Sequence, residues 1–186
     1  MSPVLVLVAG PDASGKSTLV EGLREEPWAR ELDYVAAESL TTDRFRELVE
    51  GRGPGLVVET SFAGAGAVSF LRRAKASGCF VRMFFVGTSD PCINASRIVM
   101  RVLAGGESVP VDRMLRSYVR SMANLSAAIR LADRVYVYDN SVDGAPARLA
   151  ARIASGRLCR LYGALPEWVA DTTLDLDRHW GATHAA

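Results

Sequence analysis

A short motif near the start of the chain restricts its fold more than any other feature. The apolar run VLVLVA, residues 4–9, leads directly into Gly10-Pro11-Asp12-Ala13-Ser14-Gly15-Lys16-Ser17-Thr18. This segment fits G-x-x-x-x-G-K-[ST], the phosphate-binding loop, which needs a strand before it and a helix after it. The two fixed glycines let the backbone curl until successive N–H groups point inward at a polyphosphate. The motif therefore predicts that residues 10–18 form a nucleotide site at the end of a buried strand.

Lys16 and Ser17 have separate roles in such a loop. Lys16 is one of two lysines in the chain, against twenty arginines, and its compact ammonium suits contact with the β- and γ-phosphates. The Ser17 hydroxyl is the expected Mg²⁺ ligand. A helix that begins near Lys16 adds the positive end of its dipole. We expect ATP and Mg²⁺ as cofactors, and a plain Gly/Ser turn is the alternative interpretation.

Charge and composition argue against several classes of protein. The formal net charge of the 186 residues is +1, so no nucleic-acid partner is expected. No apolar run reaches the roughly 20 residues that span a bilayer, and residues 1–3 lack the basic start of a signal peptide. Three widely separated cysteines, Cys79, Cys92 and Cys159, indicate reduced thiols. We therefore expect a cytoplasmic protein with no membrane association.

Strand and helix patterns alternate along the chain, which is typical of a doubly wound α/β fold. Strands are expected near residues 4–9, 33–38, 55–60, 79–86 and 134–138, and helices near 16–25, 42–50, 65–77, 91–103, 111–132 and 145–155. The expected fold is a three-layer P-loop sandwich: a mostly parallel five-stranded sheet with helices on both faces. Residues 1–160 are expected to form the main domain, and residues 161–186 a docked C-terminal segment or a tail.

Further features narrow the class of P-loop protein. The guanine-reading motif [NT]-K-x-D of GTPases is absent, since Lys75 is followed by Ala76-Ser77. The chain is short for a large mechanical ATPase, whereas a small-molecule kinase fits its length and the spacing of its elements. Both histidines, His179 and His184, fall within the last dozen residues. We therefore expect a kinase-type P-loop NTPase whose general base is a carboxylate.

Arginines flank a Gly-Gly pair in the second half of the chain. Arg97 and Arg101 are four residues apart and project together from a helix. Gly105-Gly106 can flex, and Arg113 and Arg116 follow. Such a segment can close over a transferring phosphoryl group, neutralise its charge and exclude water. A solvated helix face is the alternative interpretation.

The same region resembles the zeta toxin family of P-loop kinases. Residues 97–110 (RIVMRVLAGGESVP) and 116–125 (RSYVRSMANL) are similar to the family patterns R-V-x-x-R-V-x-x-G-G-H-x-V-P and R-R-Y-x-R-S-x-x-N-L. Residues 58–61 (VETS) resemble the V-E-T segment, and residues 138–141 (YDNS) resemble Y-D-N-S. Together with the phosphate-binding loop, the match runs in order through residues 4–141, about three-quarters of the chain.

This resemblance implies ATP-dependent phosphoryl transfer to a sugar hydroxyl, with UDP-N-acetylglucosamine as the best-known acceptor. The family's catalytic Asp lies in a segment like N-A-D-E-I, which matches residues 36–40 (AAESL) here. Glu38 is then the expected base, and Asp43 is the reserve candidate. Glu59 and Ser61 are expected to contact the acceptor. Lys16 and the arginines Arg97, Arg101 and Arg116 are expected to act on the phosphoryl group. Asn140 follows the last core strand, where a loop that borders the adenine is common, and an ordinary Asx turn is the alternative interpretation.

Departures from the family pattern leave the acceptor open. The segment between Glu38 and Leu56, which would contribute to the acceptor pocket, is shorter than expected for the family. Glu107 stands where the family has His, and Ser117 stands where it has the second Arg of R-R-Y. Three alternatives therefore stand beside the first reading. The first is a P-loop kinase that acts on another metabolite, such as a nucleoside, a sugar acid or an antibiotic. The second is a non-catalytic regulator that binds a nucleotide. The third is a toxin that a small antitoxin protein holds.

Overall fold

The structure, a computed structural model, describes residues 2–172 and is an α/β fold. Its elements in chain order are β1 (Val4–Ala9), α1 (Lys16–Glu25), β2 (Asp33–Ala36), the 3₁₀ turn η1 (Ala37–Ser39), α2 (Thr42–Val49), β3 (Leu56–Thr60), α3 (Ala67–Ala76), β4 (Phe80–Gly87), α4 (Pro91–Leu103), α5 (Val111–Leu131), β5 (Arg134–Asp139), β6 (Arg148–Ala154) and β7 (Arg157–Leu161). The alternation of strands and helices from β1 to β5 confirms the expected fold class.

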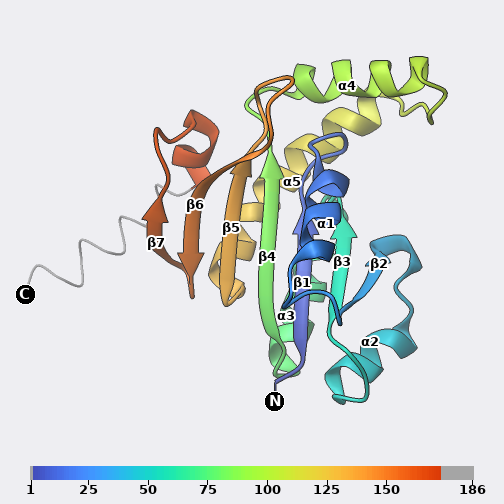
Figure 1. Cartoon of the computed structure of the whole chain (residues 1–186), viewed down its shortest axis with the longest axis vertical. Coiled ribbons are helices and arrows are strands. Elements are labelled where there is room, and N and C mark those ends of the chain that lie inside the picture. Colours follow the sequence, from blue (N-terminus) through green and yellow to red (C-terminus); the bar gives the residue numbers. More distant parts are fainter. Residues whose placement is uncertain (1, 173–186) are drawn as a thin grey trace, which may run out of the picture.

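The strands form one sheet in the order β2-β3-β1-β4-β5-β6-β7 (Figure 1). The first five strands in this order are parallel, and β6 and β7 are antiparallel to their neighbours. The chain leaves β1 for β2 on one side, while β4 lies on the other side of β1. The carboxyl end of β1 is therefore the point where the winding direction reverses, which is where ligands bind in sheets of this kind.

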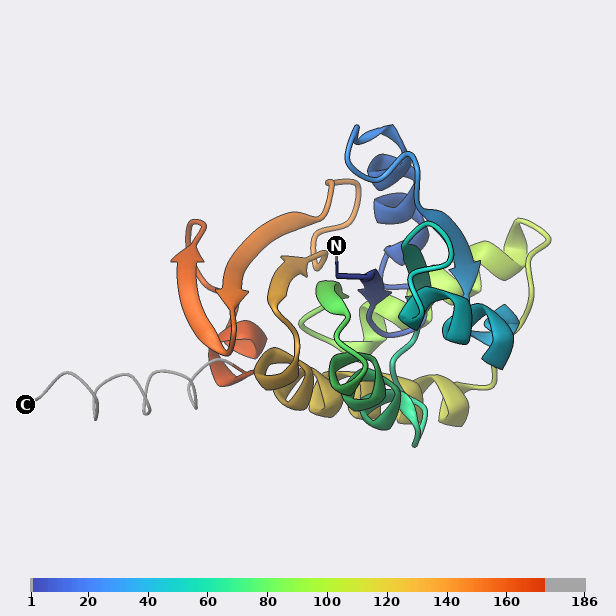
Figure 2. The same cartoon turned by 90° about the horizontal axis from the view of Figure 1, so that it is seen from below.

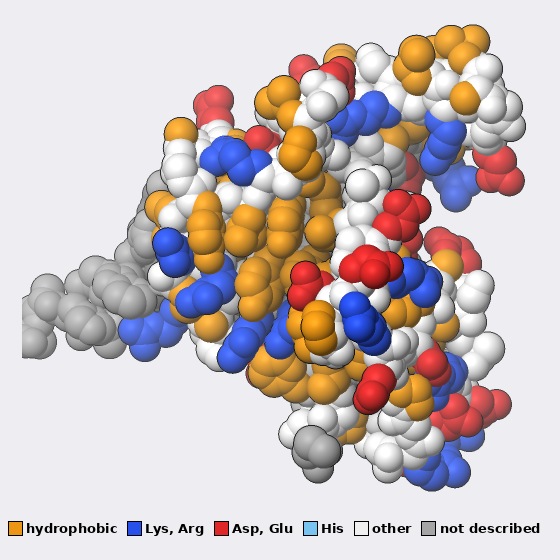
Figure 3. All heavy atoms as spheres, viewed as in Figure 1, with side chains coloured by type: hydrophobic (Ala, Val, Ile, Leu, Met, Phe, Trp, Pro, Cys, Tyr) orange, Lys and Arg blue, Asp and Glu red, His pale blue; other side chains and the backbone are white. Residues whose placement is uncertain are grey.

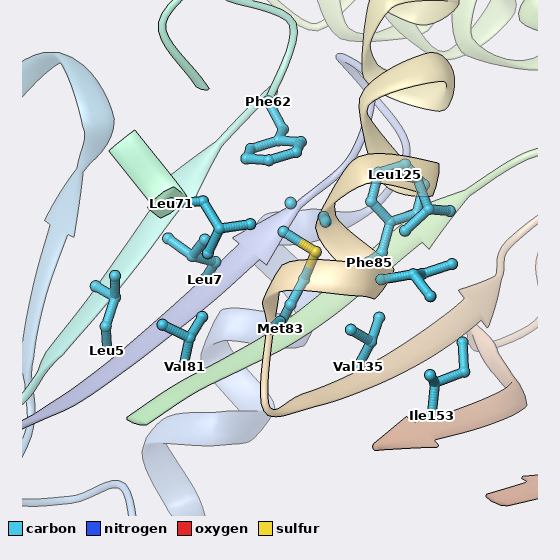
Figure 4. Close-up of a cluster of buried hydrophobic side chains, with 14 of the residues drawn as sticks. Leu5, Leu7, Phe62, Leu71, Val81, Met83, Phe85, Leu125, Val135 and Ile153 are labelled. Carbon is cyan, nitrogen blue, oxygen red and sulfur yellow. The ribbon is translucent and has the colours of Figure 1, made fainter. Parts of the chain in front are cut away.

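Helices cover both faces of the sheet, as Figure 2 shows: α3 and α5 lie on one face and α1 on the other. The alternation of side chains along β1 explains this arrangement. Leu5 and Leu7 belong to the core under α3 and α5, whereas Val6 and Val8 pack with Val20 of α1. Figure 4 shows the larger cluster, where Leu71 of α3 and Leu125 of α5 meet the strand residues. All of these side chains are at most 8% exposed.

Aromatic side chains add to the cover of the sheet face on which α1 lies. Phe84 of β4 stacks on Tyr136 of β5 with ring centroids 5.0 Å apart, and on Trp28 at 6.1 Å. The guanidinium of Arg82 lies 4.3 Å from the Trp28 ring centroid. Hydrophobic side chains are visible over β4 and β5 in Figure 3. This stack, together with the cluster that includes Val20 and Leu23 of α1, buries Phe84 to 6% exposure.

The prediction of a helix over residues 145–155 is wrong, because residues 148–154 form β6 and the chain then turns into β7. The sheet therefore has seven strands rather than five. Ser155 and Gly156 connect the two strands with φ values of 49° and 73°, the paired left-handed conformation of a two-residue type I′ hairpin. The Ala- and Arg-rich sequence RLAARIA favours a helix locally. Pairing with β5 and β7 overrides that preference.

The end of the described chain packs on the same core as the sheet. Trp168 and Val169, in the helical residues 167–172, are buried, and the Trp168 indole Nε1 donates to Asp139 Oδ1 at 3.0 Å. Gly87 makes room for the indole, since a Cβ there would lie 2.6 Å from a Trp168 ring atom. His179 and His184 lie outside the described residues. None of the helices in residues 2–172 has the length and apolar character that crossing a membrane requires.

Candidate functional site

The loop between β1 and α1 has a backbone shape that requires glycine at two positions. Gly10 has φ 145°, and a Cβ there would lie 2.0 Å from the Val86 carbonyl oxygen. Gly15 has φ 100°, and a Cβ there would lie 2.4 Å from Asn140 Nδ2. Both glycines therefore combine a left-handed backbone with a close neighbour. The loop reaches the curled form that the motif predicts because it packs directly against β4 and the segment after β5.

Two asparagine side chains hold the loop from outside. Asn94 Nδ2 of α4 donates to the Asp12 carbonyl at 2.6 Å, and Asn140 Nδ2 donates to the Ser14 carbonyl at 2.8 Å. Asn94 is fully buried and also accepts a 2.5 Å hydrogen bond from Thr88 Oγ1. These bonds use loop carbonyls and leave loop N–H groups for an anion. Asn94 was not predicted, because a lone Asn in a helix carries no sequence signal.

Lys16 begins α1, and its ammonium folds back over the loop. Its Nζ donates to the Pro11 carbonyl at 2.8 Å. Burial lowers the pKa of Lys16 below its usual value of 10.5, while the carboxylates of Asp12 and Glu59 offset part of this effect. An ammonium removed from water in this way gains most from a nearby phosphate.

Ser17 and Glu59 are 42 residues apart in sequence and meet at the carboxyl ends of adjacent strands. Ser17 Oγ donates to Glu59 Oε1 at 2.8 Å. A hydroxyl and a carboxylate side by side are the oxygen ligands that Mg²⁺ takes in proteins, together with water and substrate phosphates. The donor set therefore fits Mg²⁺, with Ser17 as a ligand and Glu59 bound directly or through water.

These groups open into one cavity of about 920 Å³. Its walls come from the phosphate-binding loop, η1, the end of β3, α4 and α5. It brings together Lys16, Ser17, Glu38, Glu59, Ser61, Arg97, Arg101 and Arg116. Asp12, Ala13, Gly15 and Thr18 also line it, while Gly10, Pro11, Ser14 and Asn140 are not among its lining residues. The sequence-predicted residues thus fall into a lining set and a set that shapes the loop behind it.

The two carboxylates considered as base lie in different places. Glu38 is in η1, the 3₁₀ turn directly after β2, rather than in the strand itself. Its side chain is exposed and lines the cavity. Asp43 lies in the first turn of α2, pairs with Arg46 at 2.9 Å, and is not a lining residue. The geometry therefore favours Glu38.

The arginines approach the cavity from two helices. Arg97 Nη2 donates to the Asn140 carbonyl and to Asp143 Oδ1, both at 3.0 Å, which ties α4 to the loop after β5. Arg116 pairs with Asp112 one turn earlier in α5 at 2.5 Å. Figure 3 shows basic side chains gathered below α4. Arg97 is thus already anchored, while Arg116 is held only by an exposed pair.

Further arginines of α5 line the same cavity, namely Arg113 and Arg120. They lie three residues before and four after Arg116, so all three share one helix face. The sequence places Arg113 beside Arg116 in the arginine-rich segment after the Gly-Gly pair, whereas Arg120 was not assigned a role there. The spacing of four residues was the signal that could have found it.

The Gly-Gly pair ends α4 in a defined conformation. Gly105 has φ 90°, its N–H donates to Val102 O at 2.9 Å, and the Gly106 N–H donates to Arg101 O at 2.9 Å. These two bonds are those of a Schellman motif. A Cβ at Gly106 would lie 2.7 Å from Arg101 Cγ. The pair therefore stops the helix and leaves space for the Arg101 side chain.

Comparison with known proteins shows where this fold occurs. No protein-family profile matches the chain, and no curated protein matches its sequence. A chain of the native AvrRxo1-ORF1:AvrRxo1-ORF2 complex has a TM-score of 0.60 at 16% identity, over 92% of this chain and 64% of that one. The same complex with ATP gives 0.58 at 13% identity, over 95% and 76%.

A third structure comes from the PezAT chromosomal toxin–antitoxin system of Streptococcus pneumoniae. Its TM-score is 0.51 at 12% identity, and the match covers 100% of this chain and 88% of that one. This chain shares the fold of these three structures. It spans less than two thirds of the length of the native AvrRxo1 chain. At these identities, the likeness establishes the architecture, and the chemistry has to be argued from the residues in the cavity.

Proposed function

We propose that this chain is an ATP·Mg²⁺-dependent kinase of the zeta toxin type, which transfers the γ-phosphate of ATP to a hydroxyl of a small acceptor. One observation carries the proposal: a single cavity holds a phosphate-binding loop, a carboxylate pair and arginines from two helices. These are the parts that phosphoryl transfer needs, namely a phosphate cradle, a base and positive charge around the transferred group. The similarity to a complex crystallised with ATP supports nucleotide binding.

The nucleotide end of the cavity is formed by the loop and the start of α1. Lys16 moves from the Pro11 carbonyl to the β- and γ-phosphates, and loop N–H groups bind the remaining phosphate oxygens. Ser17 and Glu59 would hold Mg²⁺, which neutralises phosphate charge when it is bound. Burial of the Lys16 ammonium makes this electrostatic contact stronger than it would be in water.

Glu38 is the base at the acceptor end. Its carboxylate accepts the proton of the acceptor hydroxyl as that oxygen forms a bond to the γ-phosphorus. The bond between the γ-phosphorus and the β–γ bridging oxygen breaks, and ADP leaves with the bridging oxygen. Arg97, Arg101 and Arg116 stabilise the charge on the transferring group. Ser61 contacts the acceptor beside Glu38. Glu59 lies between the Mg²⁺ site and the acceptor, where its carboxylate can orient a metal-bound water and contact the acceptor hydroxyl.

UDP-N-acetylglucosamine is the first acceptor to test, because of the resemblance to zeta toxins. Another small metabolite with a hydroxyl is the main alternative, since Glu107 lines the cavity and adds negative charge where the family pattern has His. Ser117 likewise lines the cavity without the charge of a second Arg. These two positions affect the choice of acceptor more than they affect phosphoryl transfer itself.

The experiment is incubation of the full chain with ATP, Mg²⁺ and a metabolite panel that includes UDP-N-acetylglucosamine, read by mass spectrometry. We expect one compound to gain a phosphoryl group while ATP becomes ADP. Lys16→Ala should lose this activity, and Lys75→Met, the matched lysine control, should keep it. ATP binding without modification of any panel compound would contradict the kinase and favour the nucleotide-binding regulator.

A small antitoxin protein is the partner that we propose for this kinase. Exposed apolar side chains follow one another on α4 and α5, namely Val99, Met100, Leu103, Val111, Leu115 and Val119, and such a patch is typical of a protein contact. Two of the similar structures come from complexes or toxin–antitoxin systems. Induced expression of the chain alone should slow growth, and Lys16→Ala should abolish this effect. Equal growth of cells that express the wild-type chain and cells that express Lys16→Ala would contradict toxicity.

A further inference from the structure

A second cavity of about 360 Å³ lies beside the first. Its floor is the sheet face at Leu7 and Val58, and its walls come from α2, α3 and the segment after η1. Thr60 and Gly64 line both cavities. The two spaces are therefore neighbours with a common wall, and a ligand in the larger one can extend toward the smaller one.

The walls of this second cavity are aromatic. Phe45 and Phe70 face each other with ring centroids 5.2 Å apart and planes tilted by 54°, and Phe62 lines the same space. Figure 4 shows Phe62 and Leu7 on the same side of the sheet. The Arg73 guanidinium lies 5.2 Å from the Phe45 ring centroid. Rings arranged in this way bind another flat apolar ring by edge and face contacts.

Polar groups in the walls are partly occupied by the protein itself. Thr41 Oγ1 accepts from Arg44 N at 3.1 Å, and Thr60 Oγ1 accepts from Phe62 N at 3.0 Å. Arg73 is the charged side chain among the lining residues, and its guanidinium lies over the Phe45 ring. A sugar placed here would lose hydrogen bonds to water and find few in return. The chemistry of the cavity therefore selects an apolar group.

The position of the cavity points to the acceptor rather than to ATP. None of the residues 10–18 of the phosphate-binding loop lines it. Ala37 and Leu40, on either side of Glu38, do line it, and so does Thr60, which follows Glu59. The cavity thus opens next to the two carboxylates that face the acceptor.

The last part of the segment between β3 and α3 borders the cavity with small residues only. Residues 63–67 read Ala-Gly-Ala-Gly-Ala, so no side chain there is larger than a methyl group. A Cβ at Gly64 or Gly66 would meet no atom within 4 Å. Larger side chains at these positions would have space to occupy. This run of small residues leaves the space that a ligand group can fill.

We propose that this cavity is the acceptor subsite for an aromatic ring. In this arrangement the ring of the acceptor lies against Phe45, Phe62 and Phe70, which line the cavity, while its hydroxyl lies between Glu38 and the γ-phosphate. That the bound ring belongs to the acceptor rests on the proposed kinase function. That the cavity binds an aromatic ring rests on the cavity alone. A cavity of this size and apolar lining matches small-molecule sites in general.

The test uses indole as an aromatic probe, titrated into the ¹⁵N-labelled full chain and followed by NMR. We expect amide shifts at Phe45, Phe62, Phe70, Thr60 and Gly64. Gly66→Leu fills the cavity and should weaken indole binding at least tenfold. Gly66 has an ordinary φ of −87°, so the change adds no backbone strain. Gly22→Leu is the matched control, because Gly22 also has free space around its Cβ but lies in α1.

The two arms of the experiment separate the ring site from the kinase. Absence of indole shifts at these residues in the wild-type chain would overturn the ring site, whatever the kinase assay gives. Equal indole binding by Gly66→Leu and Gly22→Leu would also overturn it. In the metabolite panel, the phosphorylated compound should carry an aromatic ring, and Gly66→Leu should raise its KM at least tenfold with ATP affinity unchanged. A ring-free product with unchanged KM would overturn the acceptor assignment, and absence of ATP binding would refute the kinase alone.

Discussion

Lys16 and Lys75 lie at opposite ends of the sheet and have different partners. Lys16 contacts only a loop carbonyl among the hydrogen bonds of the described chain. Lys75 Nζ, on α3, lies 2.6 Å from Asp133 Oδ2, and Asp133 also accepts from the Val81 N–H at 2.7 Å. One lysine is therefore available to a ligand, and the other joins α3 to β4 and the start of β5.

Lys75→Met should lower the free energy of unfolding by about 1–2 kcal/mol, because it leaves the half-buried Asp133 carboxylate without its cation. Chemical denaturation measures this loss. ATP affinity should stay within twofold of the wild-type value, since Lys75 is distant from the cavity. A loss of ATP affinity with unchanged stability would contradict the structural role.

The lowered pKa of Lys16 predicts how nucleotide affinity depends on pH. Bound phosphates favour the charged ammonium, so binding raises a pKa that burial has lowered in the free protein. ATP affinity should therefore fall as pH rises through the lowered pKa, and this fall should begin below 10.5. Calorimetry over this range measures the fall. The Lys16→Arg variant stays charged over this range, so its ATP affinity should not fall. An identical fall in that variant would show that Lys16 is not the group that titrates.

Glu38→Gln should reduce kcat by about 10²–10⁴-fold, which is the usual contribution of a general base. ATP affinity should change little, because the proposed function assigns Glu38 to the acceptor and not to the nucleotide. Asp43→Asn is the matched control and should retain wild-type turnover. Steady-state kinetics on the acceptor found in the panel decides between the two carboxylates. A large loss in Asp43→Asn with none in Glu38→Gln would reverse the assignment.

At the scale of elements, the ends of α3 and α4 are built alike. Gly78 ends α3 with φ 79°, and Gly105 ends α4 with φ 90°. In both motifs the glycine N–H and the following N–H return to carbonyls of the last turn. The α4 motif lies beside Arg101, which lines the larger cavity, whereas the arginine in the last turn of α3, Arg73, lines only the smaller one. The two helix ends therefore allow structural and functional effects to be separated.

Gly105→Ala and Gly78→Ala should each destabilise the protein by about 1 kcal/mol, since both place a Cβ on a left-handed residue. Thermal unfolding checks this. Only Gly105→Ala should also lower turnover, by roughly tenfold, because it displaces the end of α4 that positions Arg101. Equal turnover in the two variants would show that the Gly-Gly pair only ends the helix.

Elements differed in how well the sequence predicted them. The buried strand β1 and helices with clear ends, such as α4 with its Asp90-Pro91 start, matched the structure because local signals and tertiary packing agree there. β6 was predicted as a helix because its Ala and Arg residues have high helix propensity. The dipeptide Ser155-Gly156 was the available turn signal, since Gly at such a position favours a hairpin.

At the scale of the molecule, the cavity is assembled from segments that are far apart in sequence. Residues from the loop after β1 through to α5 line it, and they meet because the parallel strands place their carboxyl ends at one edge. The P-loop motif and the resemblance located most of these residues in advance. Asn94 and the aromatic cavity could not be predicted, because both depend on how α2, α3 and α4 pack against other segments.

Titration calorimetry with ATP and Mg²⁺ tests the central claim most directly. The account predicts that the full chain binds ATP, that Lys16→Ala weakens binding at least tenfold, and that Lys75→Met binds like the wild type. Folded wild-type protein with no measurable affinity for ATP in the presence of Mg²⁺ would contradict the account.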